Sequence, residues 1–436
     1  MHYQTQYTAK KCSPEYAISQ ISSDDRVLIA GEPGALLRAL YQARERFTGL
    51  RLFSVFGFSG IAGTYMYTPE MAGHIEAISM LLNANAGEAW MRGAADLAMA
   101  NLSEAEQYLA ENAMPTVLLA HCAPPDEHGY LYLGTDAGCF TVALERGAKV
   151  FVQVNENMPL ICSDYARIHV SAVTAVCEFT EPLPTAPARD AALADEDKTI
   201  AGIIAERIPN GATIQLGSGP LPDIVGRSLD HHKDLGAHTD CFGSAMIHLM
   251  KKGALNNSKK DILPGISVGG YFRAPTEELQ YLHKNRQVMM KKLSWVCDPA
   301  VMSKMKGLVS VNMGLAVDFR AHVCSGCLGD GFIGGVGSQH DFARGAKRAT
   351  DGKSFIVMRS TRLAADGSRT SAILPALPDG SLVSIPRCDI MYVVTEYGAA
   401  NLRDMGVKER VNALISLAHP DFRDWLKEEA GKHGYC

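Results

Sequence analysis

The sequence lacks several features that would assign it to a specialised class of protein. Its 436 residues contain no run of about 18 apolar residues, so we expect no transmembrane helix. The N-terminal segment lacks the charged start and apolar stretch of a secretory signal, which predicts a cytoplasmic location. Charge of neither sign dominates, since 42 Lys and Arg face 47 Asp and Glu. This balance argues against nucleic acid or membrane partners and favours small molecules.

Metal and disulfide patterns are also missing. Eleven cysteines in a long chain without a secretory signal are typical of reduced, mostly buried thiols. One CxxC pair, Cys324 and Cys327, has no second pair, and the spacing of His231, His232 and His238 fits no HExxH motif. We therefore expect no metal and no tightly bound cofactor, with a redox or metal role for the CxxC pair as the lesser alternative.

Apolar runs that predict strands alternate with helical patterns along the chain. This rhythm is typical of an α/β fold with parallel sheets and helices on both faces. Strand, Gly-containing turn and helix follow each other similarly in RVLIAGEPGALLRAL and ATIQLGSGPLPDIVGRSL, which indicates a faint internal duplication. The predicted strands are 26–30, 50–56, 116–122, 149–154, 212–217, 307–312, 353–358 and 390–398, and the predicted helices are 35–47, 139–147, 199–208, 220–229, 407–418 and 421–429.

A segment rich in Pro, Ala and acidic residues, 181–198, interrupts this rhythm and predicts an interdomain linker. We expect an N-terminal α/β domain at 1–185, a linker at 186–198 and a C-terminal α/β domain at 199–436.

Two glycine-rich stretches are candidates for ligand contact. Gly217–Pro222 follows a predicted strand and opens a helix, so its backbone N–H groups could face a phosphate or an oxyanion. An ordinary βα turn is the alternative, and Pro222 in place of a third glycine disfavours a dinucleotide site. Gly329–Gly337 has no Gly-Lys-Ser/Thr after it and is therefore no P-loop; here the alternative is a flexible hairpin loop.

Two short motifs combine an acid with histidine. Asp240 ends the sequence His-Thr-Asp between two apolar segments, and by itself it is better explained as a structural hydrogen-bond partner or a solvated loop acid. The segment PPDEHGY at 124–130 is first of all a turn.

Taken together, four stretches carry a resemblance to a known family. They are PPDEHGYLYLG, VFVQVNENMP, IQLGSGPLPDIV with DLGAHTDCF, and the C-terminal run from VNMGLAVDF through GGVGSQHDFARGA to LISLAHPDFRDWL. Across roughly residues 117–426 the chain resembles the acetyl-CoA hydrolase/transferase family, which includes 4-hydroxybutyrate, butyryl and itaconate CoA-transferases; residues 1–110 match loosely. The resemblance implies two tandem related α/β domains of the CoA-transferase (NagB/RpiA-like) type with mostly parallel sheets, usually in a homodimer.

The family's chemistry implies roles for particular residues. A carboxylate attacks the acyl-CoA, and acyl-enzyme anhydride and enzyme–CoA thioester intermediates pass coenzyme A to an acceptor carboxylate. The catalytic Glu of the family falls on Asp240, and Asn312 matches an oxyanion-hole residue, with Gln215 as a further catalytic candidate. Backbone or side-chain contacts to coenzyme A are implied for Gly217, Ser218, Gly219, Pro220, Leu221, Gly334, Gly335, Val336, Gly337, Gln339 and, as a weaker match near the phosphates, Lys353.

Departures from the family pattern cluster around the chemistry. Asp240 replaces Glu, and Gly337-Ser338-Gln339 replaces Gly-Gly-Gln. The shorter acid loses about 1.5 Å of reach. This leaves three hypotheses: a CoA-transferase with an aspartyl anhydride, an acyl-CoA hydrolase with Asp240 as nucleophile or general base, and a catalytically silent acyl-CoA-binding protein. If reach limits transfer, Asp240→Glu is faster, whereas a slower variant indicates a pocket built around Asp.

The acyl and acceptor pocket is expected in the N-terminal half. Phe56–Gly60, Tyr65 and Tyr67 are possible lining residues, although their alternation favours a place in the core.

Overall fold

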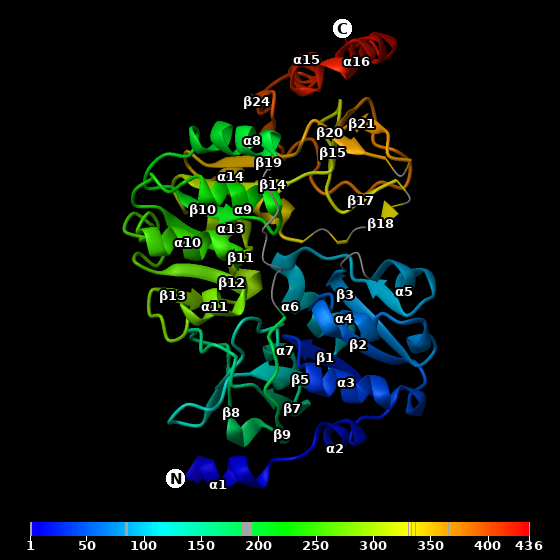
Figure 1. Cartoon of the computed structure of the whole chain (residues 1–436), viewed down its shortest axis with the longest axis vertical. Coiled ribbons are helices and arrows are strands. Elements are labelled where there is room, and N and C mark those ends of the chain that lie inside the picture. The colour runs from blue at the N-terminus through cyan, green and yellow to red at the C-terminus, as the bar shows by residue number, and fades with distance from the viewer. Residues whose placement is uncertain are drawn as a thin grey trace. The chain divides into compact units, whose positions relative to one another are not determined.

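The computed structural model describes residues 2–82, 86–184, 194–329, 331–332, 334–335, 337–364 and 366–435 (Figure 1). The chain forms two compact units, each described by itself below. Unit 1 contains Met1–Ala188, Val268–Trp295 and Ile333–Gly337, and unit 2 contains Arg189–Ser267, Val296–Phe332 and Ser338–Cys436. No helix of the described residues is long and apolar enough to cross a bilayer.

Unit 1 is built on a parallel sheet with the strand order β4-β3-β2-β1-β5-β7-β9. Its central strands consist mostly of apolar residues because both faces of a parallel sheet are covered. The strands are β1 (Arg26–Ala30), β2 (Leu50–Phe56), β3 (Ile75–Leu81), β4 (Ala95–Leu97), β5 (Val117–Cys122), β7 (Lys149–Val154) and β9 (Ala175–Glu178), with β6 (Tyr130–Tyr132) and β8 (Arg167–His169) paired separately.

The helices of unit 1 are mostly short. Strand β13 (Val288–Met290) and strand β12 (Ser267–Arg273), apart from its first residue, lie in the segment Val268–Trp295 of unit 1. The helices are α1 (His2–Ala9), α2 (Pro14–Ser19), α3 (Gly34–Gln42), α4 (Gly60–Met66), α5 (Gly87–Met91), α6 (Ala105–Tyr108), α7 (Thr141–Glu145), α11 (Thr276–Gln280) and α12 (Leu293–Val296).

In unit 2, five parallel strands run in the order β11-β10-β14-β19-β23, and β24 continues antiparallel to β23. These strands are β10 (Thr213–Leu216), β11 (Gly236–Gly243), β14 (Leu308–Met313), β19 (Lys353–Val357), β23 (Tyr392–Thr395) and β24 (Gly398–Asn401). Smaller strands are β15 (Ala316–Asp318), β16 (Val323–Cys324), β17 (Cys327–Leu328), β18 (Gly331–Phe332), β20 (Thr361–Leu363), β21 (Arg369–Ser371) and β22 (Ile373–Leu374).

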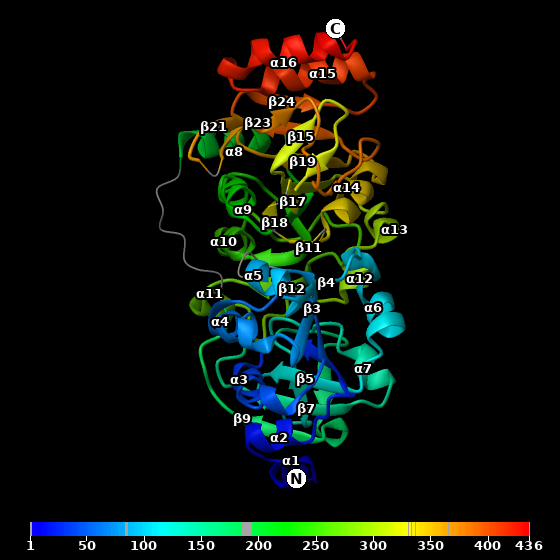
Figure 2. The same cartoon turned by 90° about the vertical axis from the view of Figure 1, so that its right-hand side faces the viewer.

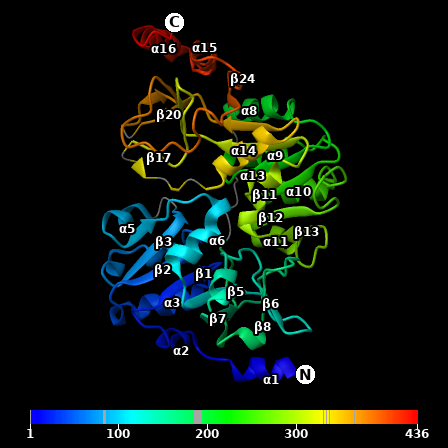
Figure 3. The ribbon, with the colours of Figure 1, turned by 180° about the vertical axis from the view of Figure 1, so that it is seen from behind.

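Helices pack against this second sheet and against one another. Helices α9 and α10 lie side by side near β10 and β11 (Figure 3), and α14 packs on β14 and β19. At the C-terminal end, α15 and α16 pack together (Figure 2) over an apolar cluster that includes Leu414 and Leu426. The helices are α8 (Asp195–Ala205), α9 (Pro220–Arg227), α10 (Ser244–Lys252), α13 (Pro299–Met302), α14 (Gln339–Arg348), α15 (Val407–Leu417) and α16 (Pro420–Lys432).

The sequence-based prediction of an α/β fold with mostly parallel sheets is confirmed, and so are the predicted strands and helices apart from their ends. The strand order β2-β1-β5-β7-β9 of unit 1 repeats as β11-β10-β14-β19-β23 in unit 2, which supports the internal duplication. If the glycine turns are aligned, Gly31 with Gly217, the strand registers make Asn312 equivalent to His121 and Asp240 equivalent to Phe56. Unit 1 therefore has no carboxylate at the place that Asp240 occupies in unit 2.

The two units are not two consecutive parts of the chain, as the sequence predicted. Two later segments, Val268–Trp295 and Ile333–Gly337, belong to unit 1. Residues 268–295 join unit 1 through backbone bonds such as Phe272 N to Thr135 O at 2.8 Å and Met290 N to Cys162 O at 2.9 Å. The predicted linker at 186–198 is too long at its end, because α8 begins at Asp195. Three acidic residues in its first turn, Asp195, Glu196 and Asp197, favour a helix start there through the helix dipole.

Candidate active site

The candidate carboxylate lies in a strand of unit 2 and is buried. Asp240 is in β11 with 6% of its surface exposed, so the alternative of a solvated loop acid is wrong. The register of β10 with β11 places Asp240 beside Gly217, immediately beyond the end of β10. Strand β10 has β11 on one side and β14 on the other, and ligands bind at such a switch point, at the carboxyl ends of the strands.

The two oxygens of Asp240 have different partners. Ser338 Oγ donates a hydrogen bond of 2.7 Å to Oδ2, whereas Gln215 Nε2 reaches Oδ1 over 3.4 Å, which is a weak bond. Burial raises the pKa of the Asp240 carboxyl, and the hydrogen bonds from Ser338, Cys241 N–H and Gln215 oppose that rise. Of the two side-chain hydrogen bonds, the one to Oδ1 is the weaker.

Gln215 and Asn312 form a reciprocal amide pair beneath the switch point. Gln215 Nε2 donates to Asn312 Oδ1 at 3.0 Å, and Asn312 Nδ2 donates to Gln215 Oε1 at 3.0 Å. Both side chains are buried, and they come from the neighbouring strands β10 and β14. The pairing fixes the orientation of the Asn312 amide and leaves its second N–H hydrogen for another acceptor. The structure thus brings together the three residues assigned to catalysis.

The glycine turn after β10 is required by close packing. A Cβ atom at Gly217 would lie 2.5 Å from Asn312 Oδ1, and one at Gly219, where φ is 156°, would lie 2.6 Å from Met313 Sδ. Only glycine permits this approach of backbone to side chain. The turn is therefore adapted to the Asn312 side chain as well as to any ligand.

Few backbone donors remain in this turn. Gly217 N–H is bonded to Val311 O at 2.8 Å, and Pro220 has no N–H. Within the described residues, no backbone carbonyl accepts from the N–H groups of Ser218, Gly219 or Leu221. Of these residues, Ser218 is exposed and Gly219 is half-buried, so their N–H groups are the ones that a ligand could reach; Leu221 belongs to the core.

Gln339 lies at the start of α14, next to Ser338. Its Nε2 donates to Met313 O at 2.6 Å, which ties α14 to the end of β14. Its buried Oε1 has no hydrogen-bond partner among the described residues. Gln339 is thus part of the frame around Asp240 in unit 2.

The glycines at 334, 335 and 337 belong to unit 1, where they pack closely on β3. A Cβ atom at Gly335 would overlap the carbonyl oxygen of Met80, and one at Gly334 would lie 2.7 Å from that of Leu82. Gly337 has a φ of 64°, which favours glycine. Val336 lies outside the described residues. Close packing accounts for Gly334 and Gly335 and the positive φ accounts for Gly337, so contact with coenzyme A stays a prediction.

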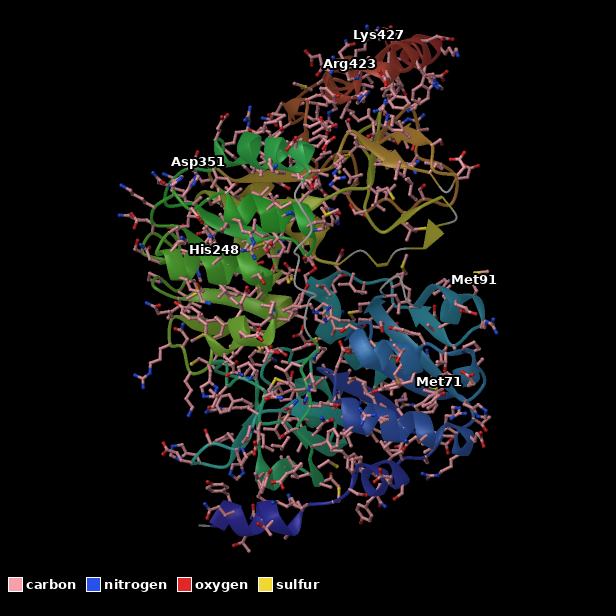
Figure 4. The ribbon with its side chains drawn as sticks, in the orientation of Figure 1. Met71, Met91, His248, Asp351, Arg423 and Lys427 are labelled. Atoms are coloured by element: carbon pink, nitrogen blue, oxygen red, sulfur yellow. The ribbon has the colours of Figure 1, made fainter. Side chains whose placement is uncertain are left out.

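Lys353 lies at the other end of the sheet in unit 2. It opens β19 and is level with Val309, three residues or about 10 Å before Asn312 along β14. Its Nζ donates to Arg207 O at 2.7 Å. It lines a cavity of about 730 Å³ at the amino ends of the strands, together with Asp351 (Figure 4) and Tyr392. The structure does not bring Lys353 to the Asp240 cluster.

The histidine and cysteine motifs have structural explanations. His238 is buried in β11, its Nε2 bonds Val296 O at 2.8 Å, and burial lowers its pKa to about 3, so the ring is neutral. Cys324 Sγ donates to Cys327 O at 2.7 Å. Among the described residues, no group of three or more His, Cys, Asp or Glu is arranged to hold a metal ion.

The aromatic residues considered for an acyl pocket are largely packed in unit 1. Tyr67 is buried, its hydroxyl accepts from Phe58 N–H at 3.0 Å, and the two rings are 5.7 Å apart. Tyr65 is half-buried, and its hydroxyl donates to Gly34 O at 3.1 Å. Core packing therefore explains Tyr67 and Phe58.

Ser338 is a site residue that the motifs did not single out. It contacts Asp240 through a buried hydrogen bond although 98 positions separate the two residues in the chain. The one signal in the sequence was the serine in Gly337-Ser338-Gln339, where the family pattern has a second glycine.

These features define a doubly wound α/β enzyme with a buried carboxylate at the carboxyl ends of a parallel sheet. A model of the acetyl-CoA hydrolase/transferase N-terminal domain matches residues 1–187, and one of the C-terminal domain matches residues 276–430. The chain belongs to the acetyl-CoA hydrolase/transferase family, which confirms the resemblance.

Individual proteins give the same result. The chain is 33% identical to 4-hydroxybutyrate coenzyme A transferase of Clostridium kluyveri, over 99% of this chain and 100% of that protein. It is 36% identical to butyryl-CoA:acetate CoA-transferase of Anaerostipes caccae, over 72% of each. The crystal structure of RipA from Yersinia pestis is similar with a TM-score of 0.94 and 32% identity, covering 100% of both chains.

Proposed function

We propose that this chain is a CoA-transferase that moves coenzyme A between a short-chain acyl-CoA and a carboxylate acceptor, with Asp240 as the nucleophile. The observation that carries the proposal is the buried Asp240 carboxylate at the switch point of unit 2, with Ser338 bonded to Oδ2 at 2.7 Å and Gln215 contacting Oδ1 at 3.4 Å. The named CoA-transferases among its relatives support the reaction class.

In the proposed reaction, Asp240 Oδ1 attacks the carbonyl carbon of the acyl-CoA. The tetrahedral intermediate expels CoA thiolate and leaves an acyl-aspartyl anhydride. The thiolate then attacks Asp240 Cγ, the former acyl group departs as a free carboxylate that carries Oδ1, and an enzyme–CoA thioester remains. An acceptor carboxylate takes the coenzyme A by the reverse steps, so the energy of the thioester is retained.

The frame around Asp240 has separate tasks in this proposal. The second N–H of Asn312 and the N–H groups of Ser218 and Gly219 are the donors that can face a developing oxyanion, and one such donor is worth ~3–4 kcal/mol. Gln215 holds the Asn312 amide in place. Lys353 has no part in the proposed site, because it lies at the amino ends of the strands.

Hydrolysis is the second candidate function. In this alternative, water takes the space that a longer glutamate would fill, and it attacks the anhydride or is activated by the Asp240 carboxylate. A panel of short acyl-CoAs crossed with carboxylate acceptors separates the possibilities. Transfer predicts exchange that depends on the acceptor, hydrolysis predicts thiol release without it, and binding without turnover would show a silent binding protein.

A homodimer is also proposed, and a measurement of molar mass in solution tests it.

The acid limb of the pH profile provides a test of Asp240. The nucleophile must be ionised, and burial raises its pKa, so protonation removes activity at a higher pH than for an ordinary aspartate. We expect kcat/KM to fall below a pKa clearly above the ordinary value of about 3.9. The measurement is kcat/KM against pH at constant ionic strength, with recovery of activity after return to neutral pH as the control for unfolding. An undiminished rate down to about pH 4 would contradict the buried nucleophile.

The amide pair gives a second test. Gln215→Leu leaves the buried Asn312 amide without its two hydrogen bonds, which costs about 1–3 kcal/mol of unfolding free energy, and it frees the amide to rotate. We expect kcat to fall at least about tenfold with a smaller change in KM. Urea unfolding and steady-state kinetics measure both quantities, and an unchanged kcat would show that the orientation of Asn312 does not matter.

A further inference from the structure

Ser338 has a contact that neither the motifs nor the proposed reaction assigns to a function. Its Oγ lies 2.7 Å from Asp240 Oδ2, and both residues are buried, with 6% of each exposed. Ser338 stands at the N-cap position of α14, but its side chain makes no capping hydrogen bond there. A hydroxyl at this position would ordinarily cap the helix. Here it is bonded to the carboxylate instead.

We propose that the Ser338 hydroxyl is a catalytic hydrogen-bond donor that acts in the half-reactions at Asp240 Cγ. This inference rests on the proposed transfer function and deepens it. When a thiolate attacks Cγ of the anhydride, the sulfur–carbon bond forms and the carbonyl electron pair moves onto Oδ2. The negative charge therefore develops on the oxygen that Ser338 already contacts. As the intermediate collapses, the Cγ–Oδ1 bond breaks and the acyl carboxylate leaves.

The same hydrogen bond has the opposite effect in the first step. There Asp240 is the attacking group, and a donor on Oδ2 makes the carboxylate less basic and so less nucleophilic. The bond also favours Oδ1 for attack, because the side-chain hydrogen bond to Oδ1, from Gln215 at 3.4 Å, is weaker than the bond to Oδ2. Ser338 therefore assists attack on Asp240 Cγ and does not assist attack on the substrate carbonyl. This asymmetry distinguishes a catalytic donor from a residue that only packs.

The test is Ser338→Ala, with Ser338→Thr as the variant that keeps a hydroxyl. Loss of the donor slows the steps at Cγ, so the anhydride persists and water intercepts it more often. We expect acceptor-dependent exchange to fall at least about tenfold, because one such donor contributes on the order of 10²-fold or more and the faster first step offsets part of that. The ratio of acceptor-independent thiol release to exchange should rise about tenfold, and Ser338→Thr should keep the wild-type ratio.

A matched control is Ser384→Ala. Ser384 is also buried in unit 2 and accepts a hydrogen bond from Ser325 N–H at 2.9 Å, so its removal reports the general cost of deleting a buried serine. Ser384→Ala should leave the ratio unchanged. If Ser338→Ala does not fold, Ser338→Gly and Ser338→Thr decide the question through the same ratio.

Failure of the proposed transfer function and failure of the proposed role of Ser338 would give different results. Wild-type protein that shows no acceptor-dependent exchange with any substrate in the panel would refute the proposed function itself. Wild-type exchange together with an unchanged rate and ratio in Ser338→Ala would overturn only the role of Ser338. An exchange rate that falls with an unchanged ratio would also overturn it, because that result describes a packing residue.

Discussion

Asp240→Asn is expected to lose acceptor-dependent CoA exchange by at least about 10³-fold in kcat, since an amide cannot form the anhydride and removal of a catalytic nucleophile can cost on the order of 10⁶. The variant keeps the shape of the side chain, and its amide oxygen can still accept from Ser338 Oγ. Exchange is measured by following transfer of coenzyme A from a short acyl-CoA to the best acceptor of the panel.

Stability is the control for this variant, and its direction follows from the same burial. Because the pKa of Asp240 is raised in the folded state, the ionised carboxylate destabilises the fold at pH values above that pKa. Asp240→Asn removes this buried charge, so its unfolding free energy at neutral pH should equal or exceed that of the wild type. Asp240→Ala also lacks the carboxylate and should be equally inactive. Wild-type exchange rates in either variant would remove Asp240 from the mechanism.

The fold was predictable from the sequence because it depends on local patterns. Apolar strands such as Val117–Cys122, which is buried throughout, cannot be mistaken for surface segments, and glycine turns mark the ends of β1 and β10. The end of the linker was misplaced because Asp195–Asp197 were counted with an acidic, Pro-rich segment, whereas their charge favours the first turn of a helix.

The site was predictable only in part. Gln215, Gly217 and Asn312 lie at the ends of adjacent parallel strands, and the carboxyl ends of such strands always meet at one edge of the sheet. Lys353 begins its strand, so the same rule places it at the opposite edge. The contact between Ser338 and Asp240 depends on how the segment before α14 returns to β11, and no local pattern encodes that path.

This chain has aspartate where the family has glutamate, and the rate of Asp240→Glu can be predicted in two opposite ways. The structure favours one of them. A reach-limited nucleophile would make Asp240→Glu faster. However, Ser338 Oγ already lies 2.7 Å from Oδ2, and an added methylene moves the carboxylate about 1.5 Å into a buried place that is occupied. We therefore expect Asp240→Glu to lower exchange on the order of 10²-fold, the cost of a misplacement of about 1 Å.

A second substitution, at Ser338, makes the prediction for Asp240→Glu more specific. Ser338→Gly removes the side chain that the longer acid would meet, so the double variant Asp240→Glu/Ser338→Gly should exchange coenzyme A faster than Asp240→Glu, up to the lowered rate of Ser338→Gly alone. Rates of the wild type, both single variants and the double variant form a cycle, and residues in contact should give a coupling well beyond additivity. Additive effects would show that Asp240 and Ser338 act independently. Faster exchange in Asp240→Glu alone would show instead that the pocket has room for the longer acid and that reach is what limits the natural side chain.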